Sequence, residues 1–202
     1  MVGKDKKRVG VILLAAGLAS RMGMPKQLMV YEQKPLIRHV LEKLLTLDLP
    51  ITVVLGARAP MIRSVIEDLP VNIVVNEAWE EGMGGSMQMG LREHLTDEAV
   101  LLCVVDQPLL TTEILEQLLA IAKNATDATQ VLGAARYQND ILGVPALFGQ
   151  QWYDAMLNLP ARVGARKLLR QYEGQVTEIS FPDGDFDLDK PQDWEKFRRE
   201  TE

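Results

Sequence analysis

The stretch VGVILLAAGLASRMGMPK (residues 9–26) joins an apolar run to a loop of small and cationic residues. Its first part, Val9–Leu14, is uninterrupted and rich in branched side chains, which is typical of a strand buried on both faces. The run ends before Gly17, and two cations, Arg21 and Lys26, follow within ten residues. This order predicts a buried strand that leads into a loop at the edge of a sheet.

Strand-like and helix-like patterns alternate along the chain after this loop. We expect further strands at Ile51–Leu55, Val71–Val75 and Ala99–Val105, separated by helices at Pro35–Leu47, Pro60–Asp68, Gly85–Leu95 and Thr111–Lys123. After Gln130 the pattern loosens into two strand-like runs, VLGAA and VPALF, helices near Gln150–Leu157 and Val163–Tyr172, and a terminal helix starting at Pro191. Alternation with short connectors predicts an α/β fold: a doubly wound, mostly parallel sheet with helices on both faces.

Length and composition limit the class of protein. A chain of 202 residues that is 47% hydrophobic and 25% charged fits one globular domain, residues 1–202. The net charge of −6 argues against a nucleic-acid partner, and no apolar run approaches the ~20 residues that a membrane span needs. The single cysteine, Cys103, excludes an internal disulfide, and the basic opening MVGKDKKR is not followed by a secretory cleavage site. We therefore expect a cytoplasmic protein.

The loop from Ala15 to Lys26 has the chemistry of an anion site. It is neither a G-x-G-x-x-G fingerprint nor a P-loop, because five residues separate its two glycines. Ala15, Ala16 and Gly17 lack bulk, so backbone N–H groups can approach an anion closely. Arg21 offers a planar fork for phosphate oxygens, and Lys26 offers a mobile point charge. The alternative interpretation is a small-residue turn with two solvated cations.

A carboxylate stands at the corresponding place after another apolar run. Asp106 directly follows the expected strand Ala99–Val105, so Asp106 and Gly17 should share the edge where open α/β sheets bind ligands. A carboxylate that faces a phosphate loop is a natural ligand for Mg²⁺. Asp187, or else Asp189, is the candidate for a second ligand. Two alternatives stay open: Asp106 could belong to a simple turn, and Asp189 could cap the terminal helix.

Four motifs, in order along the chain, carry a family resemblance. They are LLAAGLASRMGMPK (13–26), NEAWEEGMGGSMQMGL (76–91), VVDQPLL (104–110) and FDLDKPQDW (186–194). Together they resemble the signature of the nucleotidyltransferases related to molybdenum cofactor guanylyl- and cytidylyltransferases. Ala16, where guanylyltransferases tend to carry a second glycine, is more similar to the cytidylyltransferase branch. The resemblance implies a nucleotide-diphospho-sugar transferase-like, Rossmann-like fold.

The resemblance also implies roles for individual residues. Nucleotide binding falls to Leu14, Ala15, Ala16, Gly17, Ser20, Arg21, Lys26, Gly82 and Ser86, and catalysis to Arg21, Lys26 and Asp106. Arg162 and Arg166, in the segment RVGARKLL, would hold the acceptor. Alternatively, Ser86 caps the helix that follows it, and the arginines form a solvated helix face. The family's Gly-His-Pro is replaced here by Gly143-Val144-Pro145, which puts the identity of the acceptor in question.

The expected reaction is transfer of CMP from CTP to the phosphate of molybdopterin, as its molybdenum cofactor, with Mg²⁺ as cofactor and pyrophosphate as the second product. Three other functions stay open: a cytidylyltransferase for a phosphorylated sugar or polyol, a guanylyltransferase of the same family, and a non-catalytic chaperone that delivers cofactor. A transient contact with a molybdenum hydroxylase or its maturation factor is expected. Cys103 is expected to be a buried small hydrophobe, and His39 and His94 to be surface or packing residues without metal-ligand partners.

Overall fold

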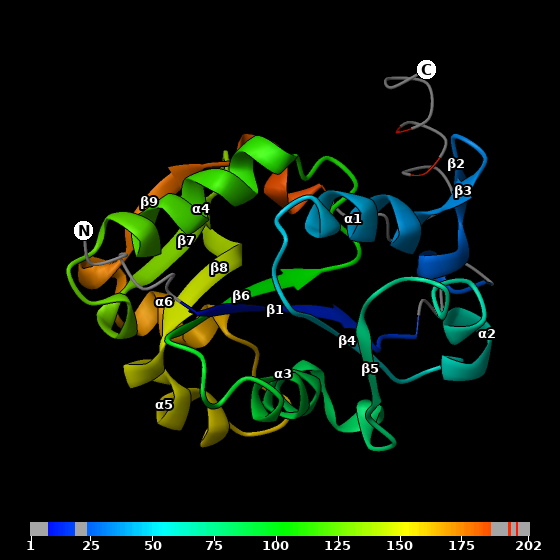
Figure 1. Cartoon of the computed structure of the whole chain (residues 1–202), viewed down its shortest axis with the longest axis horizontal. Helices are drawn as coiled ribbons and strands as arrows, with labels where there is room; N and C mark the ends of the chain where they lie inside the picture. Colours follow the sequence, from blue (N-terminus) through cyan, green and yellow to red (C-terminus); the bar gives the residue numbers. More distant parts are fainter. Residues whose placement is uncertain (1–7, 19–23, 187–193, 195–196, 198–202) are drawn as a thin grey trace, which may run out of the picture.

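The computed structural model describes residues 8–18, 24–186, 194 and 197, and its centre is a seven-stranded sheet (Figure 1). The strand order is β5-β4-β1-β6-β8-β7-β9. The strands are β1 (Val9–Ala15), β4 (Ile51–Leu55), β5 (Asn72–Val75), β6 (Ala99–Val104), β7 (Leu132–Arg136), β8 (Leu142–Gly149) and β9 (Thr177–Ser180); β2 (Val30–Tyr31) and β3 (Lys34–Pro35) form a separate hairpin. Within the described sheet only β8 runs antiparallel to its neighbours, which confirms the mostly parallel, doubly wound fold.

Helices cover both faces of this sheet. The α-helices are α1 (Leu36–Leu45), α2 (Ala59–Arg63), α3 (Met83–Arg92), α4 (Thr112–Asn124), α5 (Tyr153–Leu157) and α6 (Arg166–Gln171). Short 3₁₀ helices are η1 (Lys26–Leu28), η2 (Trp79–Glu81), η3 (Ala128–Gln130), η4 (Gln150–Trp152), η5 (Glu173–Gln175) and η6 (Pro182–Asp185). Apolar side chains of α1, α2 and α4 join one core, and those of α3, α5 and α6 join the other.

The first strand shows why the apolar run of residues 9–14 forms a central strand. Every residue of β1 is buried. Val11 and Leu13 lie in the core beneath α1, α2 and α4, whereas Ile12 and Leu14 lie in the core beneath α3, α5 and α6. Because alternate side chains of a strand point to opposite faces, an uninterrupted apolar run is needed to fill both cores.

Several expected boundaries were wrong. The helix expected at Pro60–Asp68 ends at Arg63, because the chain continues in tight turns such as the one from Leu69 N–H to the Ile66 carbonyl (3.0 Å). The helix expected from Gly85 begins at Met83, so Ser86 lies inside it and is not its cap. Strand β9 was not expected, since its TEIS sequence is mostly exposed and carries little apolar signal. The terminal helix expected from Pro191 lies outside the described residues.

The carboxyl ends of β1 and β6 lie side by side, as the sequence predicts. Leu14 pairs with Val104 in register, and the Val105 N–H donates to the Leu14 carbonyl over 3.1 Å. Gly17 and Asp106, which follow these strands, therefore emerge at the same edge of the sheet. No described helix combines the length and the apolar character that crossing a membrane requires.

Candidate active site

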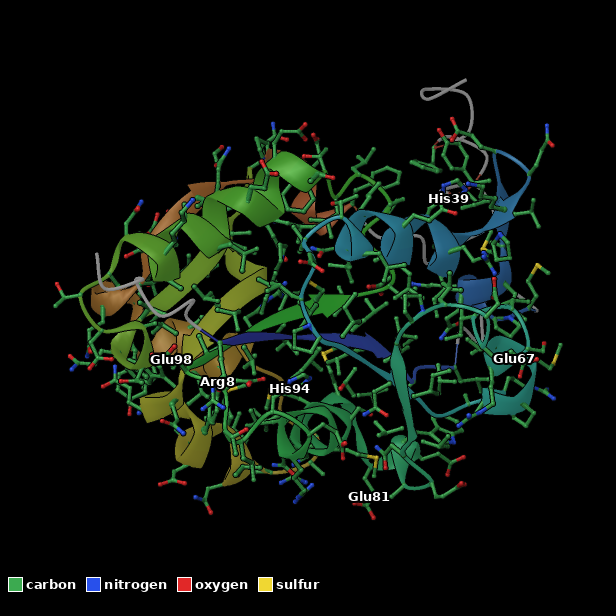
Figure 2. The ribbon with its side chains drawn as sticks, in the orientation of Figure 1. Arg8, His39, Glu67, Glu81, His94 and Glu98 are labelled. Atoms are coloured by element: carbon green, nitrogen blue, oxygen red, sulfur yellow. The ribbon has the colours of Figure 1, made fainter. Side chains whose placement is uncertain are left out.

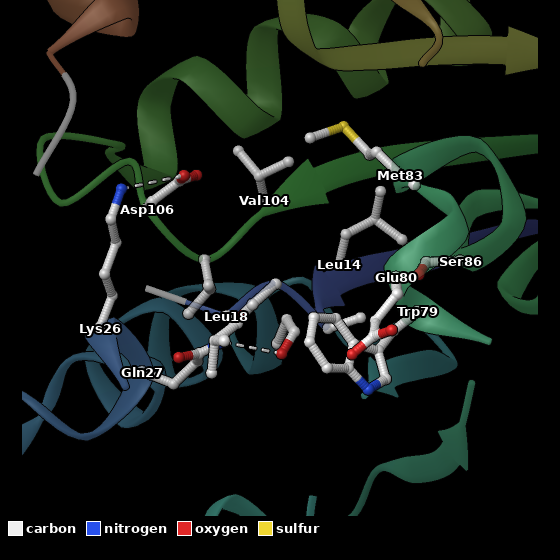
Figure 3. A pocket seen from close by; sticks show the side chains of 15 residues that line it. Leu14, Leu18, Lys26, Gln27, Trp79, Glu80, Met83, Ser86, Val104 and Asp106 are labelled. Atoms are coloured by element: carbon white, nitrogen blue, oxygen red, sulfur yellow. Dashed lines mark hydrogen bonds and ion pairs between the residues drawn. The ribbon is translucent and has the colours of Figure 1, made fainter. Parts of the chain in front are cut away.

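A cavity of about 520 Å³ opens at this edge of the sheet (Figure 3). It lies between the ends of β1 and β6 and the start of α3. Its lining residues are Leu14, Ala15, Ala16, Gly17, Leu18, Lys26, Gln27, Trp79, Glu80, Gly82, Met83, Ser86, Val104, Val105 and Asp106. We call these residues the nucleotide side, and we call the segment Leu132–Phe186 the acceptor side.

The described start of the loop after β1, residues 16–18, lines the cavity. Among the described residues, no atom lies within 4 Å of a Cβ added to Gly17, which leaves space for a ligand beside its backbone. Gln27 fixes the loop from behind, because its buried side-chain Nε2 donates to the carbonyls of Ala15 (2.8 Å) and Gly17 (3.0 Å). The sequence analysis missed Gln27, and its position directly after Lys26 was the only local signal. Small residues and one buried amide thus shape an anion-sized recess.

Lys26 and Asp106 approach each other across one end of the cavity. Lys26 starts η1, Asp106 follows β6, and the Lys26 Nζ lies 3.8 Å from a carboxylate oxygen of Asp106. The Lys26 side chain is 12% exposed and that of Asp106 is 39% exposed. At this distance both groups can serve one polyphosphate, the lysine directly and the carboxylate through a divalent cation.

The opposite end of the cavity is built by η2 and the start of α3. Trp79, Glu80, Met83 and Ser86 lie at this end in Figure 3, away from Lys26 and Asp106. The Ser86 Oγ accepts a hydrogen bond from Asn76 Nδ2 (3.0 Å), which fixes the serine from the end of β5. The sequence analysis did not single out Glu80.

Gly82 joins the nucleotide side to the acceptor side. Its φ of 125° lies in a region that favours glycine. A Cβ here would lie 2.6 Å from Arg162 Cα and 2.9 Å from the Ala161 carbonyl oxygen. The glycine therefore allows the backbone before α3 to pack directly on the segment that carries the predicted acceptor arginines.

Comparisons with known proteins agree with this geometry. Residues 11–176 match the model of the MobA-like NTP transferase domain. The chain belongs to this family. A curated relative, nicotine blue oxidoreductase of Paenarthrobacter nicotinovorans, is 36% identical over 110 residues, which cover 54% of each protein, so the chain spans about half the length of that relative.

Solved structures show the same fold. Rv0371c from Mycobacterium tuberculosis H37Rv superimposes with a TM-score of 0.83 at 23% identity, covering 96% of this chain and 98% of its own. A second structure, Rv0371c in complex with manganese, gives a TM-score of 0.78 at 22% identity, covering 96% and 99%. The predicted nucleotidyltransferase family is thus confirmed, and so is its fold.

The structure of this MobA-like protein brings some predicted site residues together and does not describe others. Seven predicted residues of the nucleotide-binding set line the cavity: Leu14, Ala15, Ala16, Gly17, Lys26, Gly82 and Ser86. Ser20, Arg21, Asp187 and Asp189 lie outside the described residues. Among the residues that are described, no three His, Cys, Asp or Glu side chains gather as a metal site would require. Asp106 is therefore the described part of the predicted metal site.

The predicted acceptor residues lie beside the cavity and not in its described lining. The backbone of Arg162 packs on Gly82, as described above. Arg166 begins α6. Burial raises the pKa of the Tyr137 phenol to about 12, and the charge of Arg166 acts in the opposite direction. The acceptor side thus has a buried tyrosine that the sequence analysis did not single out.

Two of the remaining candidates, Cys103 and His94, are buried packing residues. Cys103 is fully buried, and burial raises the pKa of its thiol. His94 lies at the amino end of the sheet, near Arg8 and Glu98 (Figure 2), and it is not one of the described residues that line the cavity. Its Nδ1 lies 2.9 Å from an Asp97 carboxylate oxygen and its Nε2 lies 2.9 Å from Thr52 Oγ1.

Proposed function

We propose that this protein is a nucleotidyltransferase that moves CMP from CTP to the phosphate of molybdopterin, as its molybdenum cofactor, and releases pyrophosphate. The observation that carries the proposal is the pairing of Lys26 with Asp106 at 3.8 Å beside a glycine loop that opens into the cavity. This arrangement suits a polyphosphate that is held at once by backbone N–H groups, a cation and a metal-binding carboxylate.

The chemistry that we propose needs no nucleophilic side chain. A phosphate oxygen of the acceptor attacks the α-phosphorus of CTP, and the bond from the α-phosphorus to the bridging oxygen breaks as pyrophosphate leaves. Lys26, Arg21 and the loop amides around Gly17 would hold the triphosphate and stabilise the charge on the departing group. Leu14, Ser20, Gly82 and Ser86 complete the proposed nucleotide site.

The donor set fits a divalent cation. Asp106 presents an oxygen ligand that is 39% exposed at the cavity, and Mg²⁺ typically takes one or two protein carboxylates and keeps its waters. Asp187, or else Asp189, would supply the second carboxylate. When bound, Mg²⁺ supplies positive charge to the phosphoryl oxygens.

The proposed substrates rest on the family resemblance more than on contacts in the cavity. Ala16 supports CTP over GTP through the family resemblance, and the cavity end beside Trp79 and Ser86 supports a site for the base. Arg162 and Arg166 would bind the acceptor phosphate. Transient contact with a molybdenum hydroxylase or its maturation factor would deliver the product. In this proposal residues 1–202 form one domain, and the protein acts in the reducing environment of the cytoplasm.

A screen of pyrophosphate release tests the proposal. CTP, GTP, ATP and UTP are each combined with Mg²⁺ and with molybdopterin, its metal-bound form or a set of phosphosugars. We expect release with CTP and a molybdopterin acceptor. Release only with a phosphosugar, or only with GTP, would replace the proposed substrates and keep the reaction class. Affinity for CTP without release with any acceptor would favour a binding or delivery protein.

A further inference from the structure

Gln107 follows Asp106 directly, and its side chain ties three segments of the chain together. It is 5% exposed, and its Nε2 lies 2.7 Å from the carbonyl oxygens of Val144 and Gly184 and 3.0 Å from the Tyr137 hydroxyl. Val144 belongs to β8 and Gly184 to η6. One amide group thus links the turn that carries Asp106 to the acceptor side.

The amide of Gln107 is oriented for donation. Acceptor atoms surround its nitrogen, while its buried Oε1 has no hydrogen-bond partner among the residues that the structure describes. A buried polar atom without a partner is costly, so a side chain needed only to fill space would be better replaced by an apolar one. The contacts of the Gln107 nitrogen give it a donor role that an apolar side chain could not fill.

Tyr137 extends this link through the acceptor side. Its hydroxyl lies 2.5 Å from the Val144 carbonyl, to which it donates, and it accepts from Gln107. Glycines enclose the ring, since a Cβ on either Gly143 or Gly184 would lie 2.2 Å from a Tyr137 atom. Because burial raises the pKa of Tyr137 to about 12, the hydroxyl keeps its proton and its donor role at neutral pH.

Arg166 stands at the far end of the link. It begins α6, which packs on β8, the strand whose Val144 carbonyl accepts from both Gln107 and Tyr137. Burial raises the pKa of the Tyr137 phenol, and the charge of Arg166 acts in the opposite direction. A path of contacts therefore runs from the turn of Asp106 through Gln107 and Tyr137 to β8, and from β8 to α6, which carries the guanidinium that would bind the acceptor.

We propose that Gln107 and Tyr137 are positioning residues that fix the location of Arg166, and hence of the acceptor phosphate, relative to Asp106. This inference rests on the proposed function. Neither residue lines the cavity, so each acts through another group. A small displacement of one reactant relative to the other is enough to slow an in-line transfer strongly.

Kinetics of Tyr137→Phe and Tyr153→Phe separate positioning from packing. Tyr153 is a matched control, because it is also a buried tyrosine. Its hydroxyl donates to the Asp97 carbonyl (3.1 Å), which lies just before the amino end of β6, at the opposite end of that strand from Asp106. With CTP and molybdopterin we expect Tyr137→Phe to raise the KM for molybdopterin by about fivefold to tenfold and to lower kcat, as loss of one positioning hydrogen bond implies. The KM for CTP should stay within about twofold, and Tyr153→Phe should change none of the three.

Gln107→Met provides a second test that does not depend on the tyrosine. It keeps the length of the side chain and removes the donor, so it should shift the same constants in the same direction. Equal kinetic effects of Tyr137→Phe and Tyr153→Phe would overturn the proposal, and so would an unchanged KM for molybdopterin in Gln107→Met.

A readout without turnover keeps the inference apart from the proposed function. Crystal structures of the wild-type, Tyr137→Phe and Tyr153→Phe proteins give the separation of the Asp106 carboxylate and the Arg166 guanidinium. We expect that separation to change in Tyr137→Phe only. An unchanged separation overturns the positioning role, even if the wild-type protein transfers CMP. Failure of the wild-type protein to release pyrophosphate from CTP overturns the proposed function, while the crystallographic comparison still decides the positioning role.

Discussion

The nucleotide side and the acceptor side are built in different ways. On the nucleotide side, Gly17 and Asp106 follow the parallel strands β1 and β6. Lys26, nine residues after Gly17, lies 3.8 Å from Asp106. On the acceptor side, β8 runs antiparallel between β6 and β7, and Arg166 begins α6, which packs on β8. The chemistry proposed for the nucleotide side depends on residues at strand ends, whereas that proposed for the acceptor side depends on contacts between segments that are distant in sequence.

The strongest test of this difference removes the charges of the nucleotide side. We expect Asp106→Asn and Lys26→Met each to lower kcat for CTP by about 10²–10³, because each would remove charge stabilisation at the phosphates. Thermal unfolding should change little, since both groups lie at a cavity and are not in a core. Steady-state pyrophosphate release measures the loss.

Lys34→Met is the control for Lys26→Met. Lys34 is an exposed lysine whose Nζ pairs with Glu42 (2.9 Å) in the hairpin region. It should keep full activity. If Lys26→Met kept the same activity as Lys34→Met, the nucleotide side would not be the centre of charge stabilisation.

The contrast also explains how much the sequence could predict. Gly17 and Asp106 were predictable, because apolar runs mark buried strands and parallel strands end at one edge. Gln107 was not, since its Nε2 partners include a carbonyl 77 residues away and another 37 residues away. The polar, mostly exposed β9 also gave no periodic signal. The strands and the edge at which they end can thus be predicted from local patterns. The contacts of the acceptor side join segments that are distant in sequence, so local patterns do not predict them.

Gly82 and Gly17 test the contact between the nucleotide side and the acceptor side, because Gly82 packs on the acceptor side and Gly17 lines the cavity. We expect Gly82→Ala to lower the free energy of unfolding by about 1–3 kcal/mol, because a φ of 125° strains an alanine and its Cβ would meet Arg162 Cα at 2.6 Å. Gly17→Ala should leave this free energy within about 0.5 kcal/mol, since its Cβ would meet no atom of the described residues within 4 Å.

Activity should separate the same two variants in the other direction. The methyl group of Gly17→Ala would enter the space proposed for the triphosphate, so its KM for CTP should rise while its stability holds. Urea unfolding and steady-state kinetics measure both quantities. Equal stability of the two variants would mean that the backbone before α3 can shift at little cost, and that the contact between Gly82 and Arg162 is not rigid.

The smallest effect is expected at the outer edge of the acceptor side. Arg136 on β7 forms an ion pair with Glu178 on β9, and it also pairs with Glu173 (3.0 Å). The hydrogen bond from Arg136 lowers the pKa of the Glu178 carboxyl below its ordinary value of 4.5. Since the Glu178 side chain is 39% exposed, solvent screens the pair, and Glu178→Gln should cost under about 1 kcal/mol of unfolding free energy at pH 7.

The pH dependence gives this prediction its sign. A carboxyl whose pKa is lower in the folded protein stabilises the fold above its ordinary pKa and loses that contribution as the pH falls through the folded value. The difference in unfolding free energy between wild type and Glu178→Gln should therefore be present at pH 7 and shrink below about pH 4.5. Glu116→Gln, at an exposed glutamate of α4, is the control. CMP transfer by Glu178→Gln should be unchanged, because this pair lies on the sheet edge and not on the path from Asp106 to Arg166; a loss of transfer would extend the positioning network to β9.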